Sequence, residues 1–257
     1  MNDRFRQRIA AHETALGTCV TFADATVTEA LAQTLDFVWI DMEHNPLSLS
    51  AVQAHVMAAE LAGATALVRV PWNDAVLIKP VLDLGAAGVI VPLIRTADDA
   101  RRAVAACRYS PDGVRGFGPR RPSHYGRDGG PDYCRAANEK MITIVQIEHA
   151  EAVANLDEIL AVPGLGGVVV GPNDLSGSLG LMGQPRHPDV LAAAQTVLDK
   201  ARRAGIPAGM AVGDDPDVLA DWIDRGAQWL SMGADFTLLL RAAGQLTARL
   251  REHRPPR

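Results

Sequence analysis

The chain has 257 residues, of which 48% are hydrophobic and 21% charged, a composition typical of a globular protein with a full core. Its net charge of −5 argues against a nucleic-acid partner, because a phosphate-binding surface normally tips the balance toward basic residues. No apolar run approaches the roughly 20 residues of a membrane-spanning helix, and the N-terminal segment lacks the apolar stretch of a secretory signal. Three cysteines without CxxC spacing predict a reduced, cytoplasmic protein: Cys19, Cys107 and Cys134.

Short apolar runs rich in β-branched residues alternate with longer runs of helical periodicity. A short, polar, arginine-rich helix is expected first, over residues 3–13. Eight apolar runs are predicted as strands, at residues 17–22, 37–41, 66–70, 88–94, 142–148, 167–170, 207–212 and 229–232. Helices are predicted at residues 26–34, 50–62, 74–84, 98–107, 150–161, 187–204, 216–225 and 237–253.

Strands that are almost continuously apolar, with helices between them, indicate a parallel sheet covered on both faces. Eight such units in a chain of this length predict an α/β protein with a closed (β/α)₈ barrel, a TIM barrel. An open, doubly wound sheet is the alternative, but it would not need an eighth unit. Because no linker or low-complexity tract interrupts the chain, we expect one domain over residues 1–257.

One connection is unusually long. Residues 109–133 form a Gly-, Pro- and Arg-rich stretch of 25 residues, which is predicted as a loop. Loops of this length in compact domains are usually functional or mobile. The stretch follows a helix and therefore starts at the N-terminal end of the barrel. We expect it either to climb the outside of the barrel or to pack on a neighbouring subunit.

In barrels of this kind, functional side chains lie where the strands end. Polar residues gather at the ends of the second, third, fifth and sixth predicted strands, which lie on one side of the barrel mouth. They are Asp41, Glu43, His44, Arg69, Gln146, Glu148, Asn173 and Asp174.

Gln146 and Glu148 are two residues apart and therefore point to the same face of their strand. Asp174 follows the neighbouring strand, in a turn after Gly171-Pro172. Two carboxylates, completed by water and a bidentate substrate, would form an octahedral site for Mg²⁺ or Mn²⁺. The structural alternative is an ion pair between Glu148 and an arginine.

Arg69 and His44 suggest what such a site could do. The planar guanidinium of Arg69 suits a carboxylate or the oxygen of an enolate, although pairing with a buried Glu43 would also explain it. His44 follows two acids, and a neutral imidazole oriented by a carboxylate is a usual general base near neutral pH. A purely structural histidine is the alternative.

Other cofactors find no support in the sequence. The three lysines do not end a strand, so a Schiff-base lysine is not expected: Lys79, Lys140 and Lys200. No glycine-rich nucleotide-binding motif follows a strand, no pyridoxal phosphate site is expected, and the histidines form no zinc-ligand set. Carbonyl chemistry would therefore depend on a divalent metal.

Together these segments resemble the HpcH/HpaI aldolase family of metal-dependent class II pyruvate aldolases. The resemblance rests on DMEHNPLS (41–48), LVRVP (67–71), LDLGAAGVIVPLI (82–94), RYSPDGVRGFG (108–118), QIE (146–148) and GPNDLSGSLG (171–180). These motifs occur in the family's order and span roughly residues 15–250.

The resemblance implies a carbon–carbon lyase that adds the enolate of pyruvate or hydroxypyruvate to an aldehyde and cleaves 4-hydroxy-2-oxo acids. It implies Mg²⁺, Mn²⁺ or Co²⁺ as the cofactor and a trimer or hexamer that exchanges its last helix. It also implies roles for single residues: Glu148 and Asp174 as metal ligands, Gln146 and Asn173 as contacts to the 2-oxo acid, Arg69 as enolate stabiliser, His44 as base with Asp41 nearby, and Asp83 as an acid that supports the histidine across a subunit interface.

One segment departs from the family pattern. Residues 116–127 are richer in arginine than expected of a hydroxyoxoheptanedioate aldolase, and RGFGP (115–119) is similar to the macrophomate synthase branch, which decarboxylates oxaloacetate. An oxaloacetate decarboxylase or related enolate-forming enzyme is therefore an alternative function. A non-catalytic keto-acid-binding barrel is an alternative of a different class.

Overall fold

The computed structural model describes residues 3–253. Within them, eight parallel strands close into one barrel, in which each strand pairs with the next and the last returns to the first. The strands are β1 (Ala15–Val20), β2 (Phe37–Asp41), β3 (Thr65–Arg69), β4 (Gly88–Val91), β5 (Ile142–Ile147), β6 (Gly167–Val170), β7 (Ala208–Val212) and β8 (Trp229–Ala234). The predicted barrel is confirmed, and the open sheet is wrong.

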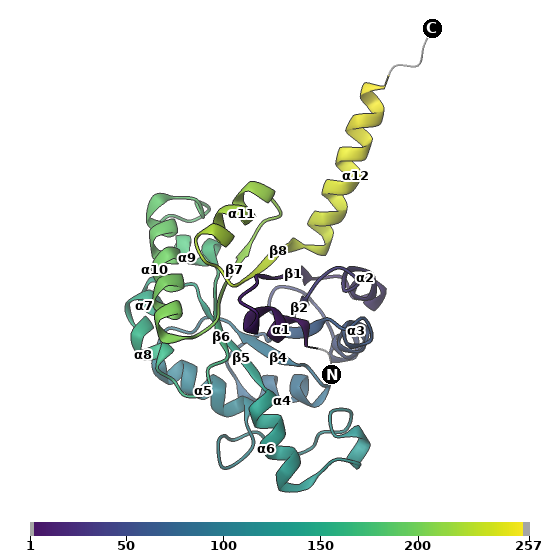
Figure 1. The fold of residues 1–257 in the computed structure, drawn as a ribbon, viewed down its shortest axis with the longest axis vertical. Coiled ribbons are helices and arrows are strands. Elements are labelled where there is room, and N and C mark those ends of the chain that lie inside the picture. Colours follow the sequence, from purple (N-terminus) through teal and green to yellow (C-terminus); the bar gives the residue numbers. More distant parts are fainter. Residues whose placement is uncertain (1–2, 254–257) are drawn as a thin grey trace.

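Helices surround the barrel (Figure 1). They are α1 (Arg4–Ala10), α2 (Ala25–Leu31), α3 (Leu49–Leu61), α4 (Ala75–Asp83), α5 (Ala97–Cys107), α6 (Gly130–Lys140), α7 (Ala150–Ala154), α8 (Leu156–Leu160), α9 (Pro172–Ser178), α10 (Pro188–Ala204), α11 (Pro216–Asp224) and α12 (Asp235–Glu252), with a 3₁₀ turn η1 (His124–Gly126). Among the described residues, no helix is both long and apolar enough to cross a bilayer.

Large aromatic side chains fill the N-terminal half of the barrel interior. The rings of Phe37 and Trp229 meet edge to face at 5.6 Å and are fully buried. Glycine provides the room, because a Cβ on Gly17 would lie 2.5 Å from the Phe37 ring and one on Gly209 would lie 2.2 Å from Trp229. The interior is therefore a packed core below the mouth rather than an open channel.

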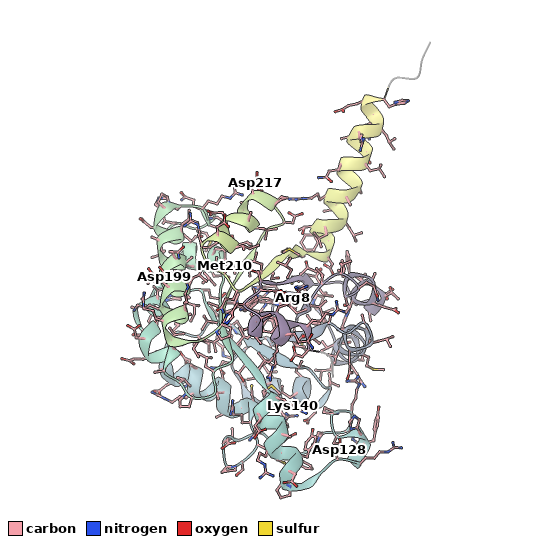
Figure 2. All side chains as sticks on the ribbon, viewed as in Figure 1. Arg8, Asp128, Lys140, Asp199, Met210 and Asp217 are labelled. Atoms are coloured by element: carbon pink, nitrogen blue, oxygen red, sulfur yellow. The ribbon has the colours of Figure 1, made fainter. Side chains whose placement is uncertain are left out.

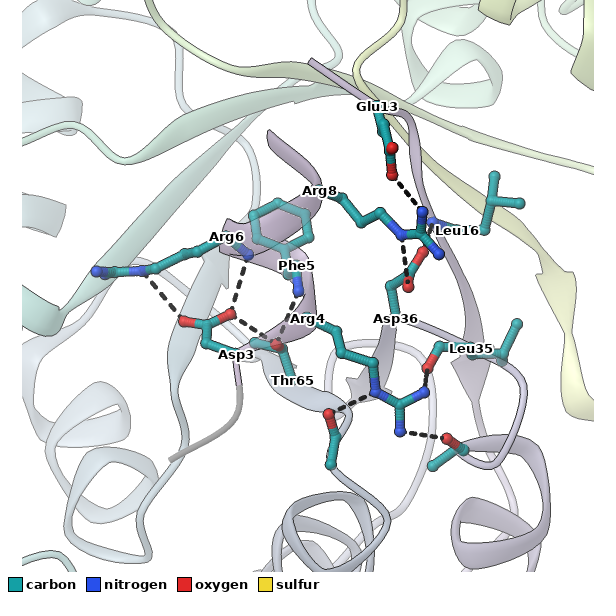
Figure 3. A network of polar contacts seen from close by, with 12 residues as sticks. Asp3, Arg4, Phe5, Arg6, Arg8, Glu13, Leu16, Leu35, Asp36 and Thr65 are labelled. Atoms are coloured by element: carbon teal, nitrogen blue, oxygen red, sulfur yellow. Dashed lines mark hydrogen bonds and ion pairs between the residues drawn. The ribbon is translucent and has the colours of Figure 1, made fainter. Parts of the chain in front are cut away.

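Helix α1 closes the N-terminal end of the barrel (Figure 3). Phe5 packs edge to face on Phe37 and Trp229, at 5.4 and 5.7 Å. The guanidinium of Arg4 donates hydrogen bonds to the carbonyls of Ala32, Leu35 and Gly63, at 2.9, 2.9 and 2.6 Å. These carbonyls lie just beyond the C-terminal ends of α2 and α3, where helices leave acceptors without partners in the helix. One arginine therefore ties α1 to two neighbouring helices.

The segment predicted as a 25-residue loop, residues 109–133, is partly helical. Its last residues begin α6, which has Pro131 in its first turn. The rest folds back on this chain: Arg115 stacks on the Tyr109 ring at 4.4 Å and pairs with Asp83 at the end of α4, with Nη2 2.9 Å from Oδ1. Arg121 pairs with Glu60 at the end of α3. The segment thus covers the helix ends at the N-terminal side of the barrel.

The C-terminal helix was predicted correctly, and it projects away from the barrel (Figure 1). An ion pair joins the N-terminal part of α12 to the segment after β7, with Arg241 Nε 2.7 Å from Asp214 Oδ2. Farther along, the side chains of α12 stand clear of the barrel (Figure 2), and Leu240 is 70% exposed. The exposed leucines of α12 therefore do not pack on this chain's own barrel.

Candidate active site

The C-terminal ends of the strands surround a cavity of about 1160 Å³. Polar side chains from β2, β3, β5, β6 and the segments after them meet on one side of it, as the sequence predicted. The predicted site residues that line the cavity are His44, Arg69, Gln146, Glu148, Asn173 and Asp174. Asp41 and Glu43 lie directly behind this lining, in contact with Arg69.

Arg69, the last residue of β3, is held between two carboxylates from the end of β2. Its Nε lies 2.7 Å from Asp41 Oδ1, and its Nη1 lies 2.9 Å from Glu43 Oε2. The second contact joins opposite charges but lacks the alignment of a hydrogen bond. Burial acts to raise the pKa of Asp41, yet its bonds to Arg69 hold that pKa below the usual value. The predicted pairing of Arg69 with Glu43 is confirmed, and it fixes the guanidinium at the mouth.

His44 lies at the rim of the cavity, with its side chain 64% exposed. Its neighbouring carboxylate is Glu43, whose Oε2 is 3.7 Å from His44 Nε2. Asp41 is instead occupied by Arg69, by the Asn45 amide at 2.5 Å and by the Glu43 backbone N–H at 3.0 Å. Of the two acids that precede the histidine, Glu43 is thus the one placed to orient the imidazole.

Glu148, immediately after β5, is buried and held at both oxygens. The side-chain amide of Gln146 donates to Oε2 at 2.6 Å, and the backbone N–H of Leu93 donates to Oε1 at 2.7 Å. Gln146 also accepts from Arg69 Nη1 at 3.4 Å. The sequence did not indicate Leu93, whose φ of 54° lies in the left-handed region. A non-glycine residue there is strained, and such strain often marks functional sites.

Asn173 and Asp174 lie in the first turn of α9, not in the turn that the sequence predicted. Pro172 begins this helix, a position that proline suits because its missing N–H would have no helical partner. Both side chains belong to exposed residues at the cavity wall. Gly171 allows the close approach of this segment to β5, because a Cβ there would lie 2.8 Å from Glu148 Oε2.

The negative charges of Glu43, Glu148 and Asp174 fit the binding of a divalent cation. Burial, together with the negative charges of Glu43 and Asp174, raises the pKa of Glu148 to about 7, against the opposing hydrogen bond from Leu93. Burial also raises the pKa of Glu43, against the opposing effect of Arg69. A cation between Glu148 and Asp174 would relieve this excess of negative charge, and both offer the oxygen ligands that hard cations prefer. Within residues 3–253, no three acidic, His or Cys side chains cluster as a complete metal site, so water and substrate would supply the other ligands.

Asp83 does not join this group within one chain. It ends α4 at the opposite end of the barrel and pairs there with Arg115. Its predicted support of the histidine across a subunit interface stays a prediction. None of the three lysines ends a strand, as the sequence indicated: Lys79 lies on α4, Lys140 at the end of α6 and Lys200 on α10.

Comparison with known proteins places the fold and site in context. The family model described as HpcH/HpaI aldolase/citrate lyase matches residues 20–242. A "4-hydroxy-2-oxo-heptane-1,7-dioate aldolase" of Salmonella paratyphi C is 38% identical over 252 residues, covering 97% of this chain and 95% of its own.

Solved structures give the same relationship. An HpcH/HpaI aldolase/citrate lyase family protein from Burkholderia cenocepacia J2315 has a TM-score of 0.92 and 34% identity, covering 98% of this chain and 100% of its own. Macrophomate synthase has a TM-score of 0.85 and 28% identity, covering 98% of this chain and 89% of its own.

Proposed function

Because the chain belongs to the HpcH/HpaI aldolase/citrate lyase family and is an aldolase, a carbon–carbon lyase, we propose that it is the metal-dependent, class II kind. It adds the enolate of pyruvate or hydroxypyruvate to an aldehyde and, in reverse, cleaves a 4-hydroxy-2-oxo acid. The observation that carries this proposal is the line of contacts from Arg69 through Gln146 to the buried Glu148 in one cavity with Asp174.

Glu148 and Asp174 would hold Mg²⁺, Mn²⁺ or Co²⁺. When bound, such a cation supplies Lewis-acid polarisation of the 2-oxo group. Gln146 keeps the Glu148 carboxylate in one orientation through its 2.6 Å hydrogen bond. Asn173, at the exposed start of α9, would contact the carboxylate of the 2-oxo acid beside Gln146.

The remaining steps belong to this chain's own side chains. His44 takes a proton from C3 of the donor, and Glu43 at 3.7 Å steadies the imidazolium that results. Arg69, with Asp41 and Glu43 fixing its position, stabilises the negative charge on the enolate oxygen. The enolate carbon then forms the new bond to the aldehyde carbon, and the proton held by His44 passes to the aldehyde oxygen, which restores the neutral imidazole. Asp83 of a neighbouring subunit would support His44 across the subunit interface.

The direct test is an aldol screen of the purified protein with each divalent metal. Pyruvate and hydroxypyruvate are each paired with several aldehydes, and formation of the 4-hydroxy-2-oxo acid is followed by mass spectrometry. We expect turnover that needs added metal and disappears with a chelator. Failure of every pair with every metal would contradict the proposed reaction.

Replacing His44 separates aldol chemistry from the second candidate, decarboxylation of oxaloacetate, which the RGFGP segment and the likeness to macrophomate synthase support. His44→Ala should slow aldol addition by about 10²–10⁴-fold, the usual contribution of general acid–base catalysis. Decarboxylation forms the enolate without proton removal and should survive this change. An aldol rate close to wild type in His44→Ala would remove the residue from this role.

The protein is expected to act in the cytoplasm as a homo-oligomer, a trimer or hexamer, without a nucleic-acid or membrane partner. Exposed leucines on the projecting α12 support an exchange of this helix between subunits: Leu239, Leu240, Leu246 and Leu250. Leu240→Glu should lower the mass measured by light scattering, whereas the exposed Arg101→Glu on α5 should leave it unchanged. Equal masses for wild type and Leu240→Glu would argue against this arrangement.

A further inference from the structure

The active-site cavity continues well past the carboxylates of β5 and α9. Its lining there includes small residues of β7, β8 and the residue after β7: Ala211, Gly213, Ser231 and Gly233. The lining also includes residues of the connection between α9 and α10 and of the first turns of α11. We call this part the distal lobe and define it by Arg186, Asp215, Asp217 and Asp221.

The distal lobe is the part of the cavity that the proposed donor contacts leave free for the aldehyde's tail. Those contacts, Arg69, Gln146 and Glu148, lie at the ends of β3 and β5. The rest of the lining includes the ends of β7 and β8 and α11. This assignment rests on the proposed aldol function.

The charges of the distal lobe are unbalanced. Its single guanidinium, Arg186, is already paired, with Nη2 3.1 Å from Asp215 Oδ2. Asp217 and Asp221 lie four residues apart and therefore share one face of α11. Asp221 pairs with Arg225, which does not line the cavity. Asp215 and Asp221 thus each have an arginine partner, and among the described residues Asp217 has none, which leaves the lobe with one negative charge in excess.

We propose that the distal lobe selects acceptor aldehydes with an uncharged tail and disfavours those that end in a carboxylate. A carboxylate tail would have to share Arg186 with Asp215 while it approached Asp217 and Asp221. The Salmonella relative is named for a 1,7-dioate, a product with a carboxylate at each end. This chain would therefore differ from that relative in acceptor choice while it shares the carbon–carbon bond chemistry.

The test compares two acceptors that differ in the charge of the tail and by one methyl group, 4-oxobutanoate and its methyl ester. With pyruvate and the metal found best in the screen, kcat/KM should favour the ester by at least about threefold at low ionic strength. The preference should shrink as salt rises, because screening weakens repulsion between exposed charges. A preference for the acid would overturn the inference and leave the aldol function standing, whereas turnover of neither would count against the function itself.

Three acids on α11 provide two test variants and a matched control. Asp217→Asn removes a charge from the distal lobe and should raise the acid-to-ester ratio of kcat/KM by about two- to threefold at low salt. Asp221→Asn should act in the same direction. Asp224→Asn removes the same charge from α11 but from an exposed position outside the cavity, so it should leave the ratio unchanged. Equal ratios in Asp217→Asn, Asp221→Asn and Asp224→Asn would overturn the proposal.

Discussion

The two ends of the barrel are built from similar residues and use charge in opposite ways. At the N-terminal end, Arg4 fills carbonyl acceptors of two helices, and Arg8 pairs with Asp36 at 3.2 Å (Figure 3). At the C-terminal end, carboxylates crowd around one guanidinium, that of Arg69. The first arrangement satisfies polar groups and stabilises the fold, whereas the second leaves an excess of negative charge.

The N-terminal end of the barrel contributes mainly to stability, and the C-terminal end holds the candidate active site. Glu148 is as buried as a core residue, yet its surroundings raise its pKa instead of stabilising its charge. Such unfavourable charge persists at sites that bind cations or substrates, since binding relieves it. The N-terminal end should therefore respond to mutation through stability, and the C-terminal end through activity.

The largest expected effect concerns the carboxylate at the C-terminal end. Glu148→Gln keeps the shape of the side chain and removes its charge, so aldol turnover at saturating metal should fall by about 10³-fold, equivalent to the several kcal/mol that a metal supplies. Steady-state kinetics with pyruvate and the best acceptor measure this effect. A loss of less than tenfold would mean that Glu148 does not hold the cation.

The opposite end should give the reverse result. Arg4→Ala removes charged donors from the carbonyls of Ala32, Leu35 and Gly63 and should lower the free energy of unfolding by about 2–4 kcal/mol. Thermal denaturation should show a Tm lower by about 5–15 °C, with kcat/KM at 25 °C unchanged. Arg101→Ala, which breaks an exposed pair with Asp98, is the matched control and should leave Tm nearly unaltered. An unchanged Tm in Arg4→Ala would contradict the account.

A smaller effect should appear in the pH dependence of stability. The folded-state pKa of Glu148, about 7, lies above its usual value of 4.5, so the folded protein retains a proton that the unfolded chain has lost. The stability from this group is full below pH 4.5 and is lost as the pH rises to 7, by about 3 kcal/mol at most. Denaturation of the metal-free wild type and of Glu148→Gln should diverge across this range, with the variant the more stable at pH 8. A constant difference from pH 5 to 8 would contradict the shift.

Much of the fold could be predicted, because parallel strands buried on both faces produce continuous apolar runs. The helix α6 was missed, since Gly129, Gly130 and Pro131 suggested a loop, although proline is favoured in a first helical turn. The same rule explains α9, where Gly171-Pro172 suggested a turn and instead begins a helix. In a sequence, a proline after glycine is therefore compatible both with a turn and with the first turn of a helix.

The candidate site was predictable in its residues more than in its contacts. Strand ends identified the carboxylates and Arg69, because the barrel brings all strand ends to one face. The hydrogen bond from Leu93 to Glu148 could not be predicted, since a leucine with positive φ has no signature in sequence. The nearness of Glu43, rather than Asp41, to His44 depends on side-chain directions after β2 ends. The charges of the distal lobe come from α11, from Asp215 just before it and from Arg186 between α9 and α10, and only the fold brings these segments to one cavity.

The central claim is that the C-terminal end of the barrel removes a proton from C3 of a 2-oxo acid. Proton NMR of pyruvate in D₂O, with the enzyme and Mg²⁺, Mn²⁺ or Co²⁺ and with no aldehyde, tests it most directly. We predict exchange of the methyl protons for deuterium in the wild type and in Arg4→Ala, and its loss in His44→Ala and Glu148→Gln. Absence of exchange in the wild type with every metal, or exchange that persists in both of the last two variants, would contradict the account.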